Sequence, residues 1–141
     1  MEKNKLALFL QKAFKEINVQ EVKGDKHNPR ILYYHKFTSL GASTDEIPWC
    51  SSFLNFIAVK CGERGTDSAM ARSWEDWGKY LTTPVPGCVV VFERGPDPKK
   101  GHVSLYLYET KKYIYCLGGN QGDAVAISPY PKSRLVCYRG V

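Results

Sequence analysis

The segment PWCSSFLNFIAVKCG, residues 48–62, carries the clearest helical pattern in the chain. Its apolar side chains recur at three- and four-residue intervals counted from Cys50, which is the spacing of one face of an α-helix. Pro48 precedes this pattern and Gly62 follows it, as is typical of helix boundaries. The sequence therefore predicts a core-packed helix with Cys50 in its first turn.

A cysteine in the first turn of a helix has distinctive chemistry. The N–H groups at that end lack carbonyl partners within the helix and form the positive end of its dipole. Both effects favour the thiolate, which is the nucleophilic form of cysteine. The same N–H groups can donate hydrogen bonds to an oxyanion on an attacked carbonyl. Cys50 is therefore a candidate nucleophile, and a structural core cysteine is the alternative interpretation.

Towards the N-terminus, an amphipathic first helix is predicted from apolar residues at helical spacing: Leu6, Leu10, Ala13, Phe14 and Ile17. Asn28-Pro29 is interpreted as a turn, and the type of the apolar segment 31–34 stays open. A further helix is predicted over residues 67–80, because alanine and tryptophan side chains recur there and Pro84 follows. These helices would precede all of the predicted strands.

Strand chemistry begins after Gly87. Four strands are predicted from β-branched or alternating runs, at residues 88–92, 102–108, 113–117 and 134–138. Helices followed by antiparallel strands define an α+β domain. The 141 residues are enough for one such domain spanning residues 1–141.

The strand over residues 102–108 begins with a histidine. Alternation directs one set of side chains to one face, His102, Ser104, Tyr106 and Tyr108, and the other set to the opposite face, Val103, Leu105 and Leu107. If the Cys50 helix packs across the His102 face, the imidazole meets the thiol. The next strand leads into Asn120, a candidate partner for the second ring nitrogen. His35 is a competing base.

Composition limits the possible partners. The chain has 20 Lys+Arg and 14 Asp+Glu, a net charge of +6, which favours a polyanionic partner. The basic residues are scattered, so no nucleic-acid partner is predicted. The cysteine count is odd and no CxxC pair occurs, which argues against a zinc knuckle and a complete disulfide set. Besides Cys50, the cysteines are interpreted as buried core residues: Cys61, Cys88, Cys116 and Cys137.

No export signal or membrane span is predicted. The apolar group at residues 6–10 is too short for a secretory signal, and no run approaches the ~18 apolar residues of a transmembrane helix. We therefore expect a protein that is made in the cytoplasm, lacks its own anchor and does not insert into a membrane.

Four blocks of the sequence resemble a known family. They are DEIPWCSSF at 45–53, ARSWEDWG at 71–78, GHV at 101–103 and LGGNQ at 117–121. Their order and spacing are similar to those of the CHAP and NlpC-like amidohydrolases of the papain superfamily. More narrowly, the chain resembles the short single-domain cell-wall hydrolases of bacteriophages and prophages, over nearly its whole length.

The resemblance implies a papain-like fold with N-terminal helices packed on a C-terminal antiparallel sheet. It also implies Cys50 as nucleophile, His102 as base and Asn120 as the residue that orients the histidine. The implied activity is that of an endolysin-like peptidoglycan hydrolase, which cleaves an amide or peptide bond of the stem peptide through a thioester and needs no metal or organic cofactor. Amidase and endopeptidase activity are both compatible with these residues.

Further site residues and partners follow from the same resemblance. Candidate substrate-binding residues are Trp49, Asp45, Trp74 and Gln121, although large aromatics at helical spacing are more often core residues. Asp45 and Glu46 could bind calcium, but two carboxylates fall far short of a complete site. The expected enzyme is a monomer that reaches the wall through a separate pore.

Two alternative functions stay open. One is a papain-like amidase or deamidase that acts on a protein, as a toxin or effector would, with the same Cys50 and His102. The other is a cell-wall-binding module without catalytic activity, against which the complete Cys, His and Asn set argues.

Overall fold

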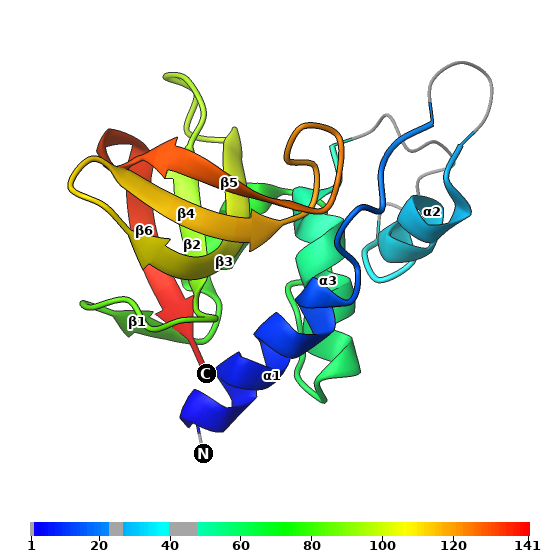
Figure 1. Ribbon diagram of the computed structural model, residues 1–141, viewed down its shortest axis with the longest axis horizontal. Helices are drawn as coiled ribbons and strands as arrows, with labels where there is room; N and C mark the ends of the chain where they lie inside the picture. The colour runs from blue at the N-terminus through cyan, green and yellow to red at the C-terminus, as the bar shows by residue number, and fades with distance from the viewer. Residues whose placement is uncertain (1, 23–26, 40–47) are drawn as a thin grey trace.

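The α-helices come first and the strands follow in the computed structural model, which describes residues 2–22, 27–39 and 48–141. The helical elements are α1 (Glu2–Phe14), α2 (Pro29–His35), α3 (Cys50–Lys60) and two 3₁₀ helices, η1 (Ala71–Asp76) and η2 (Lys132–Arg134). Figure 1 shows α1, α2 and α3 together on one side of the sheet. The predicted α+β class is confirmed.

A single antiparallel sheet contains six strands in the order β1-β6-β2-β3-β4-β5 within the described part of the chain. The strands are β1 (Lys79–Leu81), β2 (Val89–Glu93), β3 (Gly101–Glu109), β4 (Tyr113–Gly118), β5 (Ala126–Pro131) and β6 (Leu135–Gly140). The four predicted strands are confirmed as β2, β3, β4 and β6. β5 was not predicted, because Pro129 and Pro131 interrupt its pattern. It lies at the edge of the sheet, where a strand tolerates proline.

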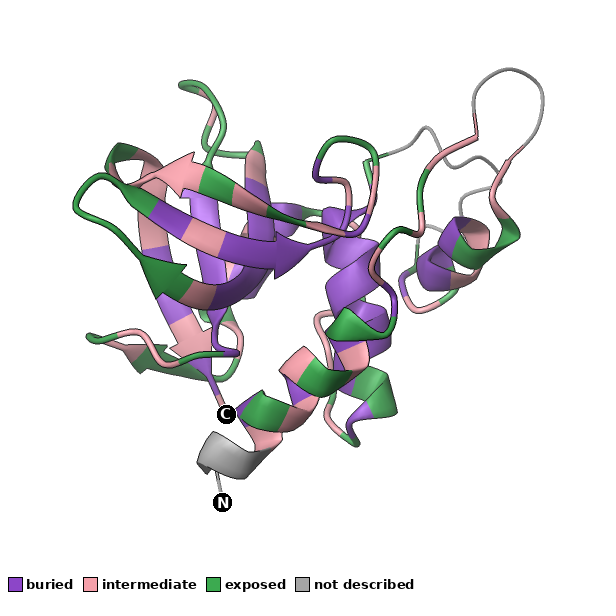
Figure 2. Ribbon diagram, in the orientation of Figure 1, coloured by how far each residue is buried: buried purple, intermediate pink, exposed green. Residues whose placement is uncertain are grey.

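The sheet is strongly curled. Phe92 of β2 and Tyr130 of β5 are separated by two strands in the sheet order, yet their ring centroids lie 4.9 Å apart. One hydrophobic core lies between the helices and the convex face and includes Val103 and Leu105. A second core fills the concave face and includes Tyr106. Figure 2 shows the buried residues concentrated in α3 and in the central strands.

The alternation predicted for β3 holds only as far as Tyr106. A β-bulge between Tyr106 and Tyr108 shifts the register, so that Tyr108 pairs with Tyr115 and their rings stack at 4.7 Å. A bulge adds one residue to one strand and reverses the direction of the side chains that follow it. The prediction that Tyr108 shares the His102 face is therefore wrong.

Helix α3 ends in the way that its sequence predicts. Gly62 has a φ of +80°, and the N–H groups of Glu63 and Gly62 donate to the carbonyls of Ala58 and Val59 at 2.9 and 3.0 Å. This pair of hydrogen bonds is a Schellman motif, in which the left-handed position favours glycine. The motif terminates the helix after Lys60, with Cys61 as the C-cap.

Asn28-Pro29 starts a helix, so its interpretation as a turn is wrong. The Asn28 side chain accepts a hydrogen bond from the backbone N–H of Arg30 at 2.8 Å, and Pro29 occupies the first helical position of α2. Both roles are typical of helix N-termini. The undecided segment 31–34 lies inside this helix.

The predicted helix over residues 67–80 is also wrong. Asp67 has a φ of +58°, and only the short 3₁₀ helix η1 forms before Gly78, whose φ of +59° turns the chain into β1. Trp74 and Trp77 are three residues apart, a spacing that a 3₁₀ helix also brings to one side. Local turn geometry therefore outweighed the helical pattern.

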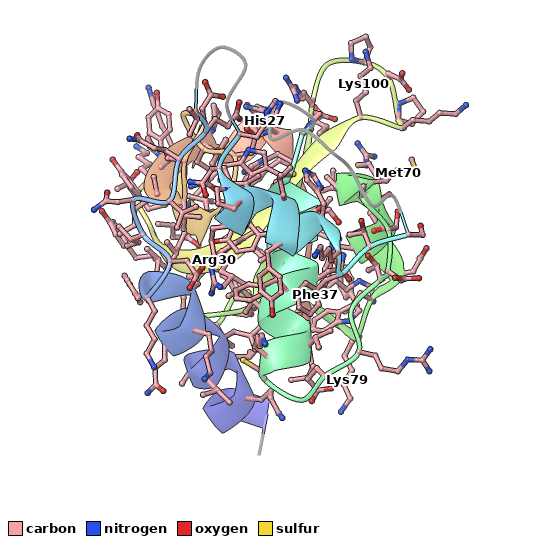
Figure 3. All side chains as sticks on the ribbon, turned by 90° about the vertical axis from the view of Figure 1, so that its right-hand side faces the viewer. His27, Arg30, Phe37, Met70, Lys79 and Lys100 are labelled. Atoms are coloured by element: carbon pink, nitrogen blue, oxygen red, sulfur yellow. The ribbon has the colours of Figure 1, made fainter. Side chains whose placement is uncertain are left out.

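Helix α2 is attached to its neighbours by a polar and aromatic cluster. Glu16 accepts hydrogen bonds from Arg30 Nε at 2.7 Å and from the Tyr34 hydroxyl at 2.6 Å. Arg30 and Phe37 both lie against Phe56 of α3 (Figure 3). Burial raises the pKa of Glu16, but the hydrogen bonds from Arg30 and Tyr34 outweigh it and hold the pKa below its ordinary value.

Removing the N-cap of α2 is expected to destabilise the protein. Asn28→Ala should lower the free energy of unfolding by about 1 kcal/mol, because the Arg30 N–H loses its acceptor. Asn28→Ser keeps a side-chain oxygen and should retain the contribution of the cap, while both variants lose the hydrogen bond that Asn28 Nδ2 donates to the Gln20 carbonyl at 2.8 Å. Urea denaturation of the two variants and the wild type measures the difference, and equal loss in both variants would show that the cap contributes nothing.

Candidate active site

Cys50 is the first residue of α3 and lies beside the beginning of β3. Helix α3 packs on the convex Val103 face of the sheet, so the condition that it packs across the His102 face is not met. Cys50 and His102 meet instead at the beginning of β3, where His102 is the second residue of the strand. Their side chains are nearly buried, with residue exposures of 5% and 8%.

The surroundings of Cys50 favour its thiolate. Burial raises the pKa of the thiol, but the charge of His102, a hydrogen bond with that ring, and hydrogen bonds from the backbone of Val103 and Ser51 act in the opposite direction. The net result is a Cys50 pKa below its ordinary value. A buried thiol with a lowered pKa is the form of cysteine suited to nucleophilic attack.

The His102 ring is held by Gln121. The Gln121 Nε2 group donates to the carbonyls of Cys116 at 3.0 Å and Ala126 at 2.6 Å, and carbonyls can only accept hydrogen bonds. The amide orientation is therefore determined, and Gln121 Oε1 must face His102 Nε2, 3.0 Å away. Ser104 donates to the same oxygen at 2.7 Å.

This contact determines the tautomer of the neutral histidine. Because Gln121 Oε1 can only accept, the hydrogen of the neutral ring resides on His102 Nε2. The Nδ1 atom is then the lone-pair nitrogen available to Cys50, as a general base requires. The prediction that Asn120 contacts the second ring nitrogen is wrong, because Gln121, the next residue, makes that contact.

Stacked aromatic rings fix the plane of the imidazole. The Tyr130 ring centroid lies 4.8 Å from that of His102, with an interplanar angle of 29°. The ring of Phe92, on the concave face, also stacks with that of His102, at a centroid distance of 6.5 Å. Phe92 and Tyr130 also stack on each other. The curl of the sheet therefore supplies the packing that keeps the ring facing Cys50.

Two glycines allow the β4–β5 connection to approach the site. A side-chain carbon on Gly118 would lie 2.3 Å from Ser104 Oγ and 2.8 Å from Gln121 Oε1. One on Gly119 would lie 2.8 Å from atoms of Trp49 and Phe53. Figure 1 shows this orange connection curving over the start of α3. Both positions therefore require a residue without a side chain for this close approach.

A cavity of about 290 Å³ opens beside the Cys50–His102 pair. The residues that line it come from the helix start, η1, the strand ends and the loops: Pro48, Cys50, Ala69, Ala71, Arg94, Gly101, His102, Asn120, Asp123, Tyr130 and Arg134. Asn120 belongs to this lining and has a φ of +57°, a conformation that asparagine tolerates. It is therefore placed to contact a bound molecule rather than the imidazole.

The predicted substrate-binding residues are mostly structural. Trp49 is fully buried and donates to Glu21 at 2.9 Å, and Trp74 is fully buried and donates to Ser51 Oγ at 2.8 Å. Gln121 is 3% exposed and uses both ends of its amide within the protein. These three predictions are wrong, because the side chains face the interior. Asp45 lies outside the described residues.

The competing base lies in the core. His35 is fully buried, its Nδ1 is 2.7 Å from Ser52 Oγ, and it does not line the cavity beside Cys50. The other cysteines, Cys61, Cys88, Cys116 and Cys137, are buried, as predicted, and all four are free. Desolvation raises the pKa of each of them, in contrast to Cys50.

The described residues contain no group of three or more His, Cys, Asp or Glu side chains that could hold a metal ion. The calcium alternative at Asp45 and Glu46 lies outside the described residues. Among the described helices, none combines the length and apolar character needed to cross a membrane.

Sequence reasoning missed several residues of the site. Ser104 shares the alternation of His102, so the strand pattern contained a signal for it. Tyr130 lies in the unpredicted strand β5, and Arg94 lies in the connection after β2. The sequence predicts Arg134 at the start of a strand, but it ends the 3₁₀ helix η2 and lines the cavity. A scan against known protein families finds no matching family, and a search of curated proteins finds no similar sequence.

The two cysteines at opposite ends of α3 should differ in reactivity. Alkylation of Cys50 by iodoacetamide is expected to reach half its maximal rate at a lower pH than that of an ordinary thiol, because its pKa is lowered. Cys61 is as buried as Cys50, but it should stay unmodified over the same pH range, since its pKa is raised and it does not line the cavity. Site-resolved mass spectrometry measures both. Identical pH profiles for the two thiols would contradict the arrangement described.

Gln121 and Asn120 form a matched pair for testing which residue orients His102. Gln121→Ala should slow Cys50 alkylation at pH 6 by about tenfold or more, since the ring loses the contact that fixes its tautomer. Asn120→Gly keeps the left-handed backbone and should alter that rate less than about twofold. The reverse order of effects would restore Asn120 as the orienting residue.

Proposed function

We propose that this protein is a papain-like cysteine hydrolase that cleaves amide bonds of bacterial peptidoglycan. The observation that carries the proposal is the Cys50–His102–Gln121 arrangement beside an open cavity, with the pKa of the thiol lowered and the imidazole held by Gln121. Nucleophile, base and orienting group are the three parts that acyl transfer by a thiol needs.

The proposed reaction has two stages. The Cys50 thiolate attacks the amide carbonyl, and N–H groups at the start of α3 stabilise the oxyanion. The protonated imidazole gives its proton to the leaving amine as the C–N bond breaks, which leaves a thioester on Cys50. His102 then takes a proton from water, whose oxygen attacks the thioester. The products are a carboxylic acid, an amine and the restored thiol.

Three features support peptidoglycan as the substrate. The sequence blocks at 45–53, 71–78, 101–103 and 117–121 resemble those of phage cell-wall hydrolases. The net charge of +6 suits an anionic wall. The cavity is open on the protein surface, as a polymeric substrate requires, and Cys50 lines it.

The test is mass spectrometry of fragments released from purified peptidoglycan. Wild-type protein should release defined peptides, and the new termini identify the bond. Cys50→Ala and His102→Ala should each reduce release by at least about a thousandfold, because each removes a group that takes part in bond cleavage.

Cys61→Ala is the matched control, since it removes a buried thiol from the other end of the same helix, far from the cavity lining. It should retain activity after allowance for any loss of stability. Absence of release from every wall chemotype by folded wild-type protein would overturn the peptidoglycan proposal. Deamidation of proteins by the same sample would then favour the protein-directed amidase.

A further inference from the structure

Two arginines line the same cavity as the Cys50–His102 pair. Arg94 directly follows β2, and Arg134 ends η2 just before β6. The pairing of β2 with β6, with Phe92 opposite Leu135, brings these two positions together. The cavity therefore has a strongly cationic side next to the thiol.

Arg134 is held in place by two contacts. Its Nε donates to the Glu93 carbonyl at 3.0 Å, and its guanidinium carbon lies 5.6 Å from the centroid of the Tyr130 ring that stacks on His102. The Nε contact leaves the two terminal nitrogens of the guanidinium for another acceptor. A guanidinium held in this way is preorganised for a carboxylate, which accepts two parallel hydrogen bonds from it.

Neither cavity arginine is neutralised by a carboxylate of the described residues. By contrast, Arg30 forms an ion pair with Glu16 and Arg72 with Glu75. The one carboxylate in the described cavity lining is Asp123, and it comes from the β4–β5 connection rather than from the β2–β6 side. Charge is therefore distributed unevenly in the cavity, with positive charge concentrated at the side of Arg94 and Arg134.

We propose that Arg94 and Arg134 form a subsite for a substrate carboxylate, so that the enzyme selects amides that carry a free carboxylate close to the scissile bond. The inference rests on the proposed amide hydrolysis and specifies its substrate class as acidic peptides. Because the carboxylate and the scissile carbonyl belong to one molecule, binding the first positions the second at Cys50.

A pair of alkylating reagents tests the subsite without any wall substrate. Iodoacetate carries a carboxylate and iodoacetamide a neutral amide, and both react with the Cys50 thiolate. The measured quantity is the ratio of their rate constants at Cys50, determined by site-resolved mass spectrometry. The ratio cancels changes in thiolate fraction, because both reagents depend equally on it.

We expect Arg94→Gln to lower the iodoacetate-to-iodoacetamide ratio by about fivefold, and the double variant with Arg134→Gln to lower it by about tenfold or more. Arg94 is exposed and makes no described side-chain hydrogen bond, so its substitution should leave the fold intact. Arg64→Gln removes an exposed cation outside the cavity lining and should change the ratio less than about 1.5-fold. An unchanged ratio in the folded Arg94→Gln and double variants overturns the subsite.

Hydrolysis of peptidoglycan provides a second test of the carboxylate subsite. Walls with native carboxylates should be cleaved by wild type at least about fivefold faster than walls whose carboxylates have been chemically amidated, and the double variant should lose this preference. Cleavage without any preference overturns the subsite and leaves the proposed function standing. A reagent ratio that depends on the arginines, without wall cleavage, keeps the carboxylate subsite and rejects peptidoglycan as the substrate.

Discussion

The Gln121 side chain is the constraint on which the site depends. Its Nε2 group binds carbonyls at the end of β4 and the start of β5, and its Oε1 atom faces His102 and Ser104 of β3. One buried amide thus joins three strands and determines the tautomer of the imidazole. A buried amide that lost any of these partners would leave polar groups unsatisfied, at a cost of about 1–3 kcal/mol each. The same energy that stabilises the strands therefore holds the base in position.

The two faces of the sheet position different residues of the site. The convex face packs against α3 and places the Cys50 end of that helix at the beginning of β3. The concave face encloses Phe92 and Tyr130, which stack near or on His102. Cys50 consequently belongs to the core on the convex side, His102 stacks against aromatic rings of the concave side, and the two meet at the edge of the sheet. Gly118 and Gly119 are small enough to let the β4–β5 connection close over this edge.

The site favours negative charge at two places, at the Cys50 thiol and farther out in the cavity. At the thiol, His102 and the backbone of Val103 and Ser51 favour the anionic form despite burial. Farther out, Arg94 and Arg134 line the cavity without a described carboxylate partner. Both features favour negative charge, first on the nucleophile and then on a bound molecule. The overall charge of +6 adds only a weak, salt-screened contribution to these local effects.

The sequence by itself determined the α+β class, four of the six strands in the described sheet, and the position of Cys50 at the start of a buried helix, because periodicity and glycine positions are local properties. It also singled out His102 at a strand beginning. Only the tertiary structure decided that Gln121 replaces Asn120 beside the imidazole, and that Trp49 and Trp74 face the core. Neighbouring residues in a loop differ in direction, and burial depends on which elements pack together. The β2–β6 pairing brings Arg94 and Arg134 together, and Tyr130 reaches Phe92 only because the sheet curls. No local pattern encodes that pairing or that curvature.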